Sequence, residues 1–199
     1  MARSIFQQRG TALEDEFFYH VDQKLIAKLE EHHKQRAVEQ SLQESTGIVD
    51  QHVLEELRVA EITPRSLAAF SMFPAVFVAW ADGHVESAER KAILKAAKGQ
   101  GIDVDSPSYE LLEHWLSKRP TVELAGAWKD FIHAIRATIS DRSFRELRDA
   151  SLNRAEEVAK ATGGFLGIGS VSRDERGALA ELHEVFDDAI ESAEPAECR

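Results

Sequence analysis

Cysteine is nearly absent from this sequence of 199 residues, which contains only Cys198. A single cysteine excludes an intramolecular disulfide and a zinc site built from several cysteines. Long hydrophobic runs are also missing. The longest, residues 67–81, is interrupted by Ser71 and Pro74 and is shorter than the roughly 20 residues that span a bilayer. The basic N-terminus lacks the apolar stretch of a signal peptide. We therefore expect a cytoplasmic protein without a membrane span, in which residues 67–81 form part of a buried helix.

Basic residues are outnumbered, since 24 Lys and Arg residues stand against 35 Asp and Glu residues, for a formal net charge of −11. A surface that binds phosphates needs an excess of Lys and Arg, so this balance argues against nucleic-acid binding. With 43% hydrophobic and 30% charged residues, the composition is typical of a folded globular protein. At this length we expect one domain, with or without an appendage.

Sustained alternation of polar and apolar residues, the pattern of a half-buried strand, is absent as well. Apolar residues instead recur at helical spacing, so we predict an all-α fold of about eight helices. Proline inside the third of these helices, at Pro74, predicts a kink. The predicted helices cover residues 12–45, a short segment after Asp50, 64–81, 87–98, a segment from Ser106 that ends before Pro120, a segment from Thr121, 141–162 and a segment from Ser172.

The first predicted helix combines dense charge with a narrow apolar stripe, formed by Phe17, Val21, Leu25 and Leu29. Such a stripe suits pairing with another helix, either of a partner or of the protein's own core. We therefore expect an N-terminal amphipathic helical arm, residues 1–46, followed by an all-helical domain, residues 47–199.

The pattern G-x-V-x-x-x-E-R occurs twice, at residues 83–90 and 169–176. Glycine lets the chain leave one helix, and a polar N-cap with an acid in the first turn starts the next. In the second copy, Ser172 and Glu175 have the spacing of a capping box, and Glu86 stands at the matching cap position in the first copy.

The first copy carries more acids than a cap needs. Asp82, Glu86 and Glu89 crowd one turn, with His84 between them. Hard divalent cations prefer several carboxylate and carbonyl oxygens, so these three residues are candidate metal ligands. The spacing is not that of an EF-hand, because the D-x-D-x-D-G run is missing. The alternative is that these acids only cap a helix and are solvated.

The segment 79–90, with Ala81-Asp82-Gly83, Val85 and Glu89, resembles the A-D-G-x-[IV]-x-x-x-E motif of the tellurite-resistance TerB-like family. The resemblance extends over about residues 60–190, because a second and weaker corner of this kind often follows in the family. It implies an all-helical TerB-like bundle that is not an enzyme and is linked to stress response and metal-ion chemistry. It also implies Asp82, Glu86 and Glu89 as metal ligands. The second corner departs from the motif, since Ile168 replaces the expected Asp, which leaves Glu175 with nearby Asp174.

Other patterns carry weaker indications. Glu30-x-x-His33 matches one element of a carboxylate-bridged di-iron bundle, but the only similar spacing is Asp130-x-x-His133, and such a site needs further Glu residues. Residues 163–169 are rich in glycine without the Lys-Ser/Thr ending of a phosphate loop, so we expect a structural turn. Nothing around Cys198 indicates a catalytic nucleophile.

Three functions follow from these residues. The first is a non-enzymatic module that binds a divalent ion, with calcium, magnesium, manganese and zinc left open, at Asp82, Glu86 and Glu89. The second is a protein-interaction scaffold without metal, which contacts its partner through the N-terminal helix. The third is a carboxylate–histidine metalloenzyme. We expect protein partners, and the oligomeric state stays open.

Overall fold

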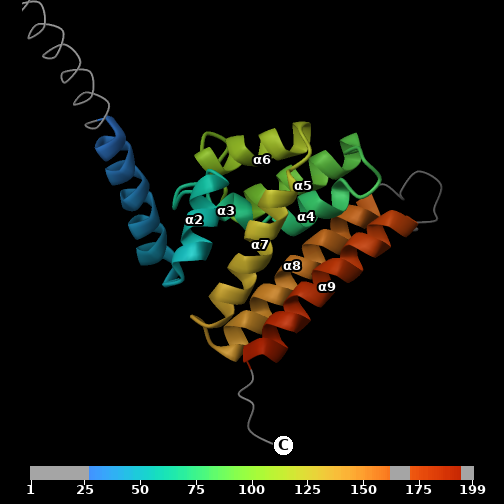
Figure 1. Ribbon diagram of the computed structural model, residues 1–199. Helices are drawn as coiled ribbons and strands as arrows, with labels where there is room; N and C mark the ends of the chain where they lie inside the picture. The colour runs from blue at the N-terminus through green and yellow to red at the C-terminus, as the bar shows by residue number, and fades with distance from the viewer. Residues whose placement is uncertain (1–26, 162–170, 194–199) are drawn as a thin grey trace, which may run out of the picture. The chain divides into compact units, whose positions relative to one another are not determined.

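The computed structural model of the protein describes residues 27–161 and 171–193. Within these ranges it contains nine helices and no strand (Figure 1), which confirms the predicted all-α class. The chain divides into two compact units, residues 1–40 and 41–199. The predicted boundary between arm and domain at residue 46 stays a prediction. Of the first unit, residues 27–40 are described; they are helical, and Leu29 is 60% exposed. The other members of the predicted apolar stripe lie outside the described residues.

The second unit begins inside the helix that ends at residue 46 and continues with eight further helices. In the described part of the chain, none of the helices has the length and apolarity needed to cross a membrane. The eight helices are α2 (Gln51–Val59), α3 (Leu67–Phe70), α4 (Phe73–Ala79), α5 (Ser87–Gly99), α6 (Pro107–Ser117), α7 (Val122–Arg136), α8 (Asp141–Ala161) and α9 (Arg173–Ala193).

Polar caps start several helices where the sequence predicts them. The side chains of Asp50, Ser106 and Thr121 each accept a hydrogen bond from a backbone N–H in the first turn of α2, α6 and α7. This contact satisfies one of the N–H groups that a helix leaves unpaired at its start. Gly47, with φ of +74°, follows the end of the first helix, and its N–H donates to the carbonyl of Gln43 at 2.8 Å.

The predicted helix over residues 64–81 is wrong in its extent. Residues 64–66 form a turn, and the helical segment is broken at Ser71 and Met72, between α3 and α4. Pro74 explains the break, since it has no N–H and its ring clashes with the preceding turn, but it fits the first turn of a new helix, where it lies in α4. The carbonyl of Ser71 at the break accepts a hydrogen bond from the Arg154 side chain on α8 at 3.3 Å.

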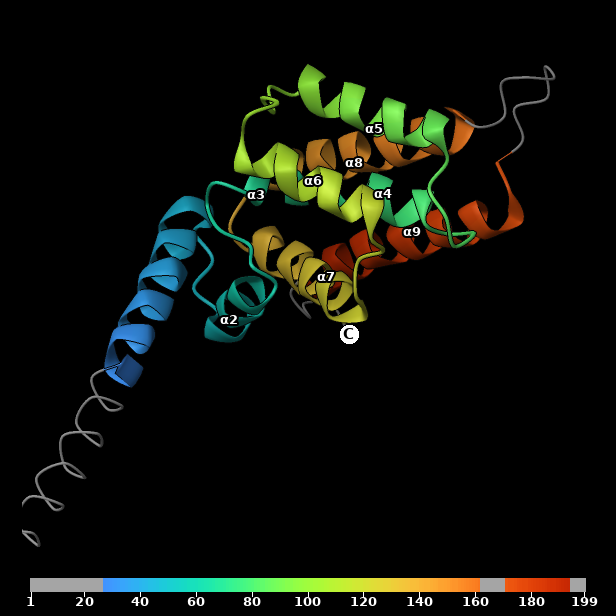
Figure 2. The same cartoon turned by 90° about the horizontal axis from the view of Figure 1, so that it is seen from above.

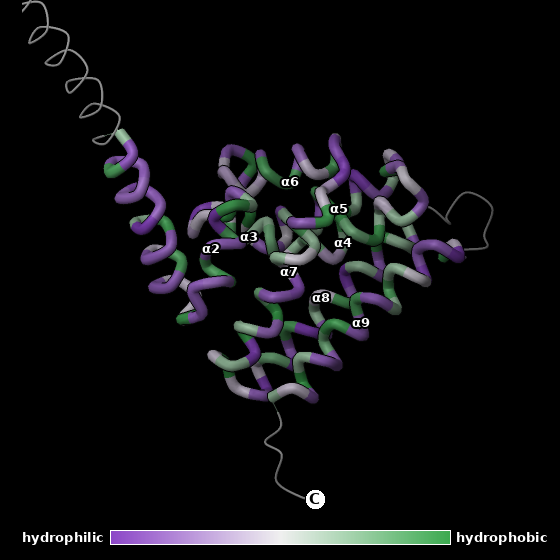
Figure 3. The backbone as a smooth tube through the Cα atoms, viewed as in Figure 1, coloured by the Kyte–Doolittle hydropathy of each residue, from purple (hydrophilic) through white to green (hydrophobic). Residues whose placement is uncertain are grey.

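Aromatic rings gather at the centre of the core of the second unit. The ring centroid of Phe73 on α4 lies 6.1 Å from Phe70, 6.1 Å from Trp115 and 5.6 Å from Trp128, and Trp128 lies 5.7 Å from Phe186 on α9. Helix α4 contacts α5, α8 and α9, while α2 contacts α7 and α6 contacts α3 and α5 (Figure 2). Along α8 and α9, hydrophobic and hydrophilic residues alternate at helical spacing, as expected of helices with one buried face (Figure 3).

Candidate functional site

The three predicted metal ligands lie at the turn between α4 and α5, which we call the first corner (residues 82–89). Gly83 turns the chain there with a φ of +94°. The carboxylate of Asp82 accepts a hydrogen bond from the backbone N–H of His84 at 3.2 Å, and it also lies 3.2 Å from Nδ1 of the His84 side chain. Local contacts therefore hold Asp82 at an exposed turn.

Glu89 contributes to a capping box at the start of α5. Its Oε2 accepts a hydrogen bond from the N–H of Glu86 at 2.7 Å, and the residue is only 3% exposed. Burial raises the pKa of Glu89, the backbone hydrogen bond opposes this, and the negative charges of Glu175, Asp82 and Glu86 add to the rise, so that the pKa reaches about 7. The folded protein therefore holds a proton on this buried carboxyl more tightly than an unperturbed glutamate does.

The second corner (residues 169–176, described from Val171 onward) repeats this arrangement. The N–H of Ser172 donates to Oε2 of Glu175 at 2.5 Å, and the N–H of Glu175 donates to Oγ of Ser172 at 3.1 Å. The predicted capping box is thus confirmed. Glu175 is 6% exposed, and its charge contributes to the raised pKa of Glu89. The fold therefore places two buried carboxyls from distant parts of the sequence near each other.

Among residues 27–161 and 171–193, no group of three or more His, Cys, Asp or Glu side chains is arranged to hold a metal ion. Asp82 is paired with His84, and Glu89 caps α5. The assignment of Asp82, Glu86 and Glu89 as ligands stays a prediction.

Asp130, one residue of the Asp130-x-x-His133 spacing, lies next to the carboxyl group of Glu56. It lies on α7 against Glu56 on α2. Burial raises the pKa of Glu56, and the hydrogen bond and negative charge of Asp130 raise it further. Oε2 of Glu56 is buried and has no hydrogen-bond partner among the described residues. On the exposed side, Nε2 of His52 lies 3.3 Å from Oε1 of Glu56.

Three features singled out in the sequence lie outside the described residues. They are the glycine-rich segment 163–169, Ile168 within it, and Cys198.

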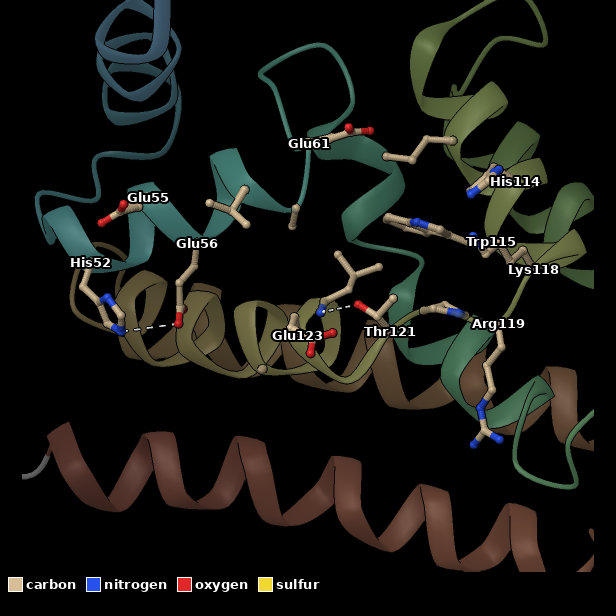
Figure 4. A pocket seen from close by; sticks show the side chains of 16 residues that line it. His52, Glu55, Glu56, Glu61, His114, Trp115, Lys118, Arg119, Thr121 and Glu123 are labelled. Atoms are coloured by element: carbon tan, nitrogen blue, oxygen red, sulfur yellow. Dashed lines mark hydrogen bonds and ion pairs between the residues drawn. The ribbon is translucent and has the colours of Figure 1, made fainter. Parts of the chain in front are cut away.

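A cleft of about 730 Å³ opens between α2, α6 and the N-terminal turn of α7 (Figure 4). We call it the α2–α6–α7 cleft. Val59 lines it and is 65% exposed, so apolar surface faces solvent there. The sequence does not reveal this cleft, because its walls come together only when separate helices pack. The apolar and small residues of its lining are Val59, Ala60, Leu111, Trp115, Pro120, Leu124 and Gly126.

Acidic and basic side chains lie on different sides of the cleft. Glu55 and Glu61 come from α2 and the residues just after it, whereas His114 and Lys118 come from the C-terminal end of α6 and the residue after it (Figure 4). Glu123, at the start of α7, has local partners: hydrogen bonds from its own N–H and from Thr121 lower its pKa.

Three charged residues of the cleft, Glu61, Lys118 and Arg119, take part in no ion pair with another described residue. Their charges are available to a bound molecule.

The backbone at Glu61 is strained. Its φ of +59° is the only positive value at a described residue other than glycine. It follows the end of α2, where the N–H of Ile62 donates to the carbonyl of Leu57 at 2.8 Å. Glycine is the usual residue at such a position, and a residue with a Cβ costs about 1 kcal/mol there. Strain of this kind clusters at binding sites and switch regions.

Comparisons with protein-family models, with curated proteins and with solved structures found no match for the chain. The resemblance to the TerB-like family therefore rests on the sequence motif and stays a prediction.

Proposed function

We propose that the protein is a non-enzymatic helical binding module and that it binds a protein partner in the α2–α6–α7 cleft. The observation that carries this proposal is the apolar lining of the cleft together with the exposure of Val59. Removing apolar surface from water contributes about 25 cal/mol per Å², so a partner that covers this surface gains free energy of binding. The proposed partner is a protein, as the sequence predicts, but it contacts the cleft instead of the N-terminal helix.

A dye with an apolar ring system and one sulfonate group tests whether the cleft binds apolar groups. The isotope-labelled protein is titrated with the dye anilinonaphthalene sulfonate, and backbone amide shifts are followed by NMR. We expect shift changes in α2, α6 and the first turns of α7, and their loss in Val59→Glu. The matched control is Val104→Glu, since Val104 is 52% exposed and does not line the cleft. Shift changes elsewhere, or an undiminished response in Val59→Glu, would contradict the proposal.

A second candidate function is divalent-metal binding at the first corner, with Asp82, Glu86 and Glu89 as ligands. It is supported by the proximity of Glu89 to the negative charges of Glu175, Asp82 and Glu86, since a bound cation would offset the repulsion among these carboxylates. The TerB-like motif supports the same candidate and would link the protein to a stress response in the cytoplasm.

Calorimetric titration with calcium, magnesium, manganese and zinc tests the second candidate. We expect heat with the wild type and none with the double variant Asp82→Asn, Glu89→Gln, whereas Glu184→Gln on the exposed face of α9 serves as the control. Because carboxyl groups must be deprotonated to bind a metal ion, metal binding should weaken as the pH falls. A wild type without heat excludes this candidate, and elemental analysis for bound iron or manganese tests the metalloenzyme alternative.

A further inference from the structure

We infer, on the basis of the proposed function, that the cleft accepts an amphipathic α-helix of a protein partner. In this arrangement Lys or Arg side chains of the partner face Glu61, and Asp or Glu side chains face Lys118. The basis is the juxtaposition of an apolar cleft with an acidic side along α2 and a basic side at the end of α6 (Figure 4).

The shape of the surface favours a helix over a compact ligand. A second hollow of about 80 Å³ adjoins the cleft and shares Arg119, Pro120 and Thr121 with it. Val122 lines this hollow and is 81% exposed, so apolar surface continues past the connection between α6 and α7. A small molecule inside the cleft would leave Val122 uncovered. A helix with apolar residues at spacings of three and four presents a long apolar face, which suits an apolar surface that continues beyond the cleft.

An extended peptide fits this surface less well. Binding of a peptide strand uses the free edge of a sheet, and the described residues contain no strand. The walls of the cleft are helices whose backbone groups are paired internally. Side-chain packing and charge are therefore what this surface offers to a partner.

The charges determine which partner helix fits and how it is oriented. Glu61 lies just after Ala60, the C-cap residue of α2, and its negative charge favours a cation of the partner at this position. Lys118 follows the last residue of α6 on the other side of the cleft. A helix with one basic and one acidic flank is thus matched in one orientation and repelled in the reverse orientation.

The strained backbone at Glu61 is a second observation that marks this residue. A glycine at this position would close α2 with less strain, yet the chain carries a glutamate with a φ of +59°. No ion pair with another described residue accounts for its charge. A carboxylate used by a partner accounts for its presence.

Selection from a displayed peptide library tests the inference. The probes are helical peptides of about 18 residues, or five turns, with fixed apolar positions and all polar positions randomised. They are selected on the full-length protein, and affinities are measured by fluorescence anisotropy. We expect enriched peptides with Lys or Arg on one flank and Asp or Glu on the other. Glu61→Lys should weaken them about five- to tenfold, and selection on this variant should enrich acidic residues on the formerly basic flank.

Matched variants separate the effect of the cleft from that of total charge. Asp105→Lys makes the same charge change at an exposed residue outside the cleft and should leave affinity within about twofold. Glu61→Gly removes the charge while relieving the strain, so weaker binding together with an undiminished free energy of unfolding would come from the lost charge. Lys118→Glu should lower the affinity for the selected peptides. Peptides in which the acidic residues that face position 118 are replaced by Lys or Arg should bind this variant with the affinity that the original peptides have for the wild type.

The outcomes distinguish this inference from the proposed function. The inference about the charged flanks is overturned if the enriched peptides lose affinity in Val59→Glu but show no charge pattern. It is also overturned if they lose affinity in Val59→Glu but bind Glu61→Lys as well as the wild type. In both cases the cleft remains the binding site. Peptides that bind Val59→Glu and the wild type equally, or a library without enrichment, overturn both.

Discussion

Replacing Glu89 with Gln removes a titrating carboxyl and keeps an oxygen that can accept the N–H of Glu86 at the start of α5. In the folded protein the pKa of Glu89 is raised from 4.5 to about 7, so the folded state holds this proton more tightly than the unfolded chain. Below about pH 4.5 both states are protonated, and the stabilisation is fully present. As the pH rises from there to about 7, the unfolded chain releases its proton first, and the stability of the folded protein falls.

The magnitude follows from the size of the shift. A rise from 4.5 to about 7 corresponds to an upper limit of about 3 kcal/mol at 1.36 kcal/mol for each pH unit. Glu89→Gln resembles the protonated wild type, so the two proteins should have similar free energies of unfolding near pH 4.5. At about pH 8 the variant should be the more stable one by up to about 3 kcal/mol.

Urea unfolding followed by circular dichroism at several pH values measures this difference. Glu184→Gln, at an exposed residue of α9, is the control and should show no comparable growth of the difference with pH. Glu175→Gln should reduce the effect at Glu89, because it removes one of the negative charges that raise the pKa. A Glu89→Gln variant whose advantage stays constant or shrinks with rising pH would refute the reasoning.

Three further predictions concern stability. Glu61→Gly relieves a φ of +59° and should leave the free energy of unfolding unchanged or raise it by up to about 1 kcal/mol. Glu61→Val should lower the free energy of unfolding by about 1 kcal/mol. Urea unfolding compares the two variants, and the reverse order of stability would argue against strain at this residue. Phe73→Ala removes a ring that is 1% exposed and should cost about 3–5 kcal/mol, measured by thermal unfolding; a cost below about 1 kcal/mol would place Phe73 outside the essential core. Ser172→Ala removes the acceptor for the N–H of Glu175 and should cost about 1 kcal/mol by the same method, and an unchanged midpoint would show that this cap does not stabilise α9.

The features that the sequence predicts correctly depend on local interactions. Asp50, Ser106 and Thr121 cap helices within a few residues of themselves, and the Ser172–Glu175 capping box needs only its own turn. Such contacts depend on spacing along the chain, which a sequence displays directly. The all-α class follows in the same way from helical periodicity.

The features that the sequence does not reveal depend on packing between distant segments. A run of apolar residues predicts a single helix over 64–81, but Pro74 fits better as part of the first turn of α4 than inside a longer helix. Nothing in the spacing of residues 52–61 and 111–126 shows that they enclose a cleft. The positive φ of Glu61 is equally hidden, because glutamate is not a residue that indicates a left-handed turn.

Site-specific photo-crosslinking tests the claim that the cleft is the binding surface most directly. A photoreactive amino acid replaces Val59, which is 65% exposed and lines the cleft, or Val104, which is 52% exposed and does not. In cells that produce the protein, we expect a discrete protein adduct at position 59 that is absent at position 104 and weaker when Glu61→Lys is added. Equal crosslinking at both positions, or none at position 59, would contradict the claim.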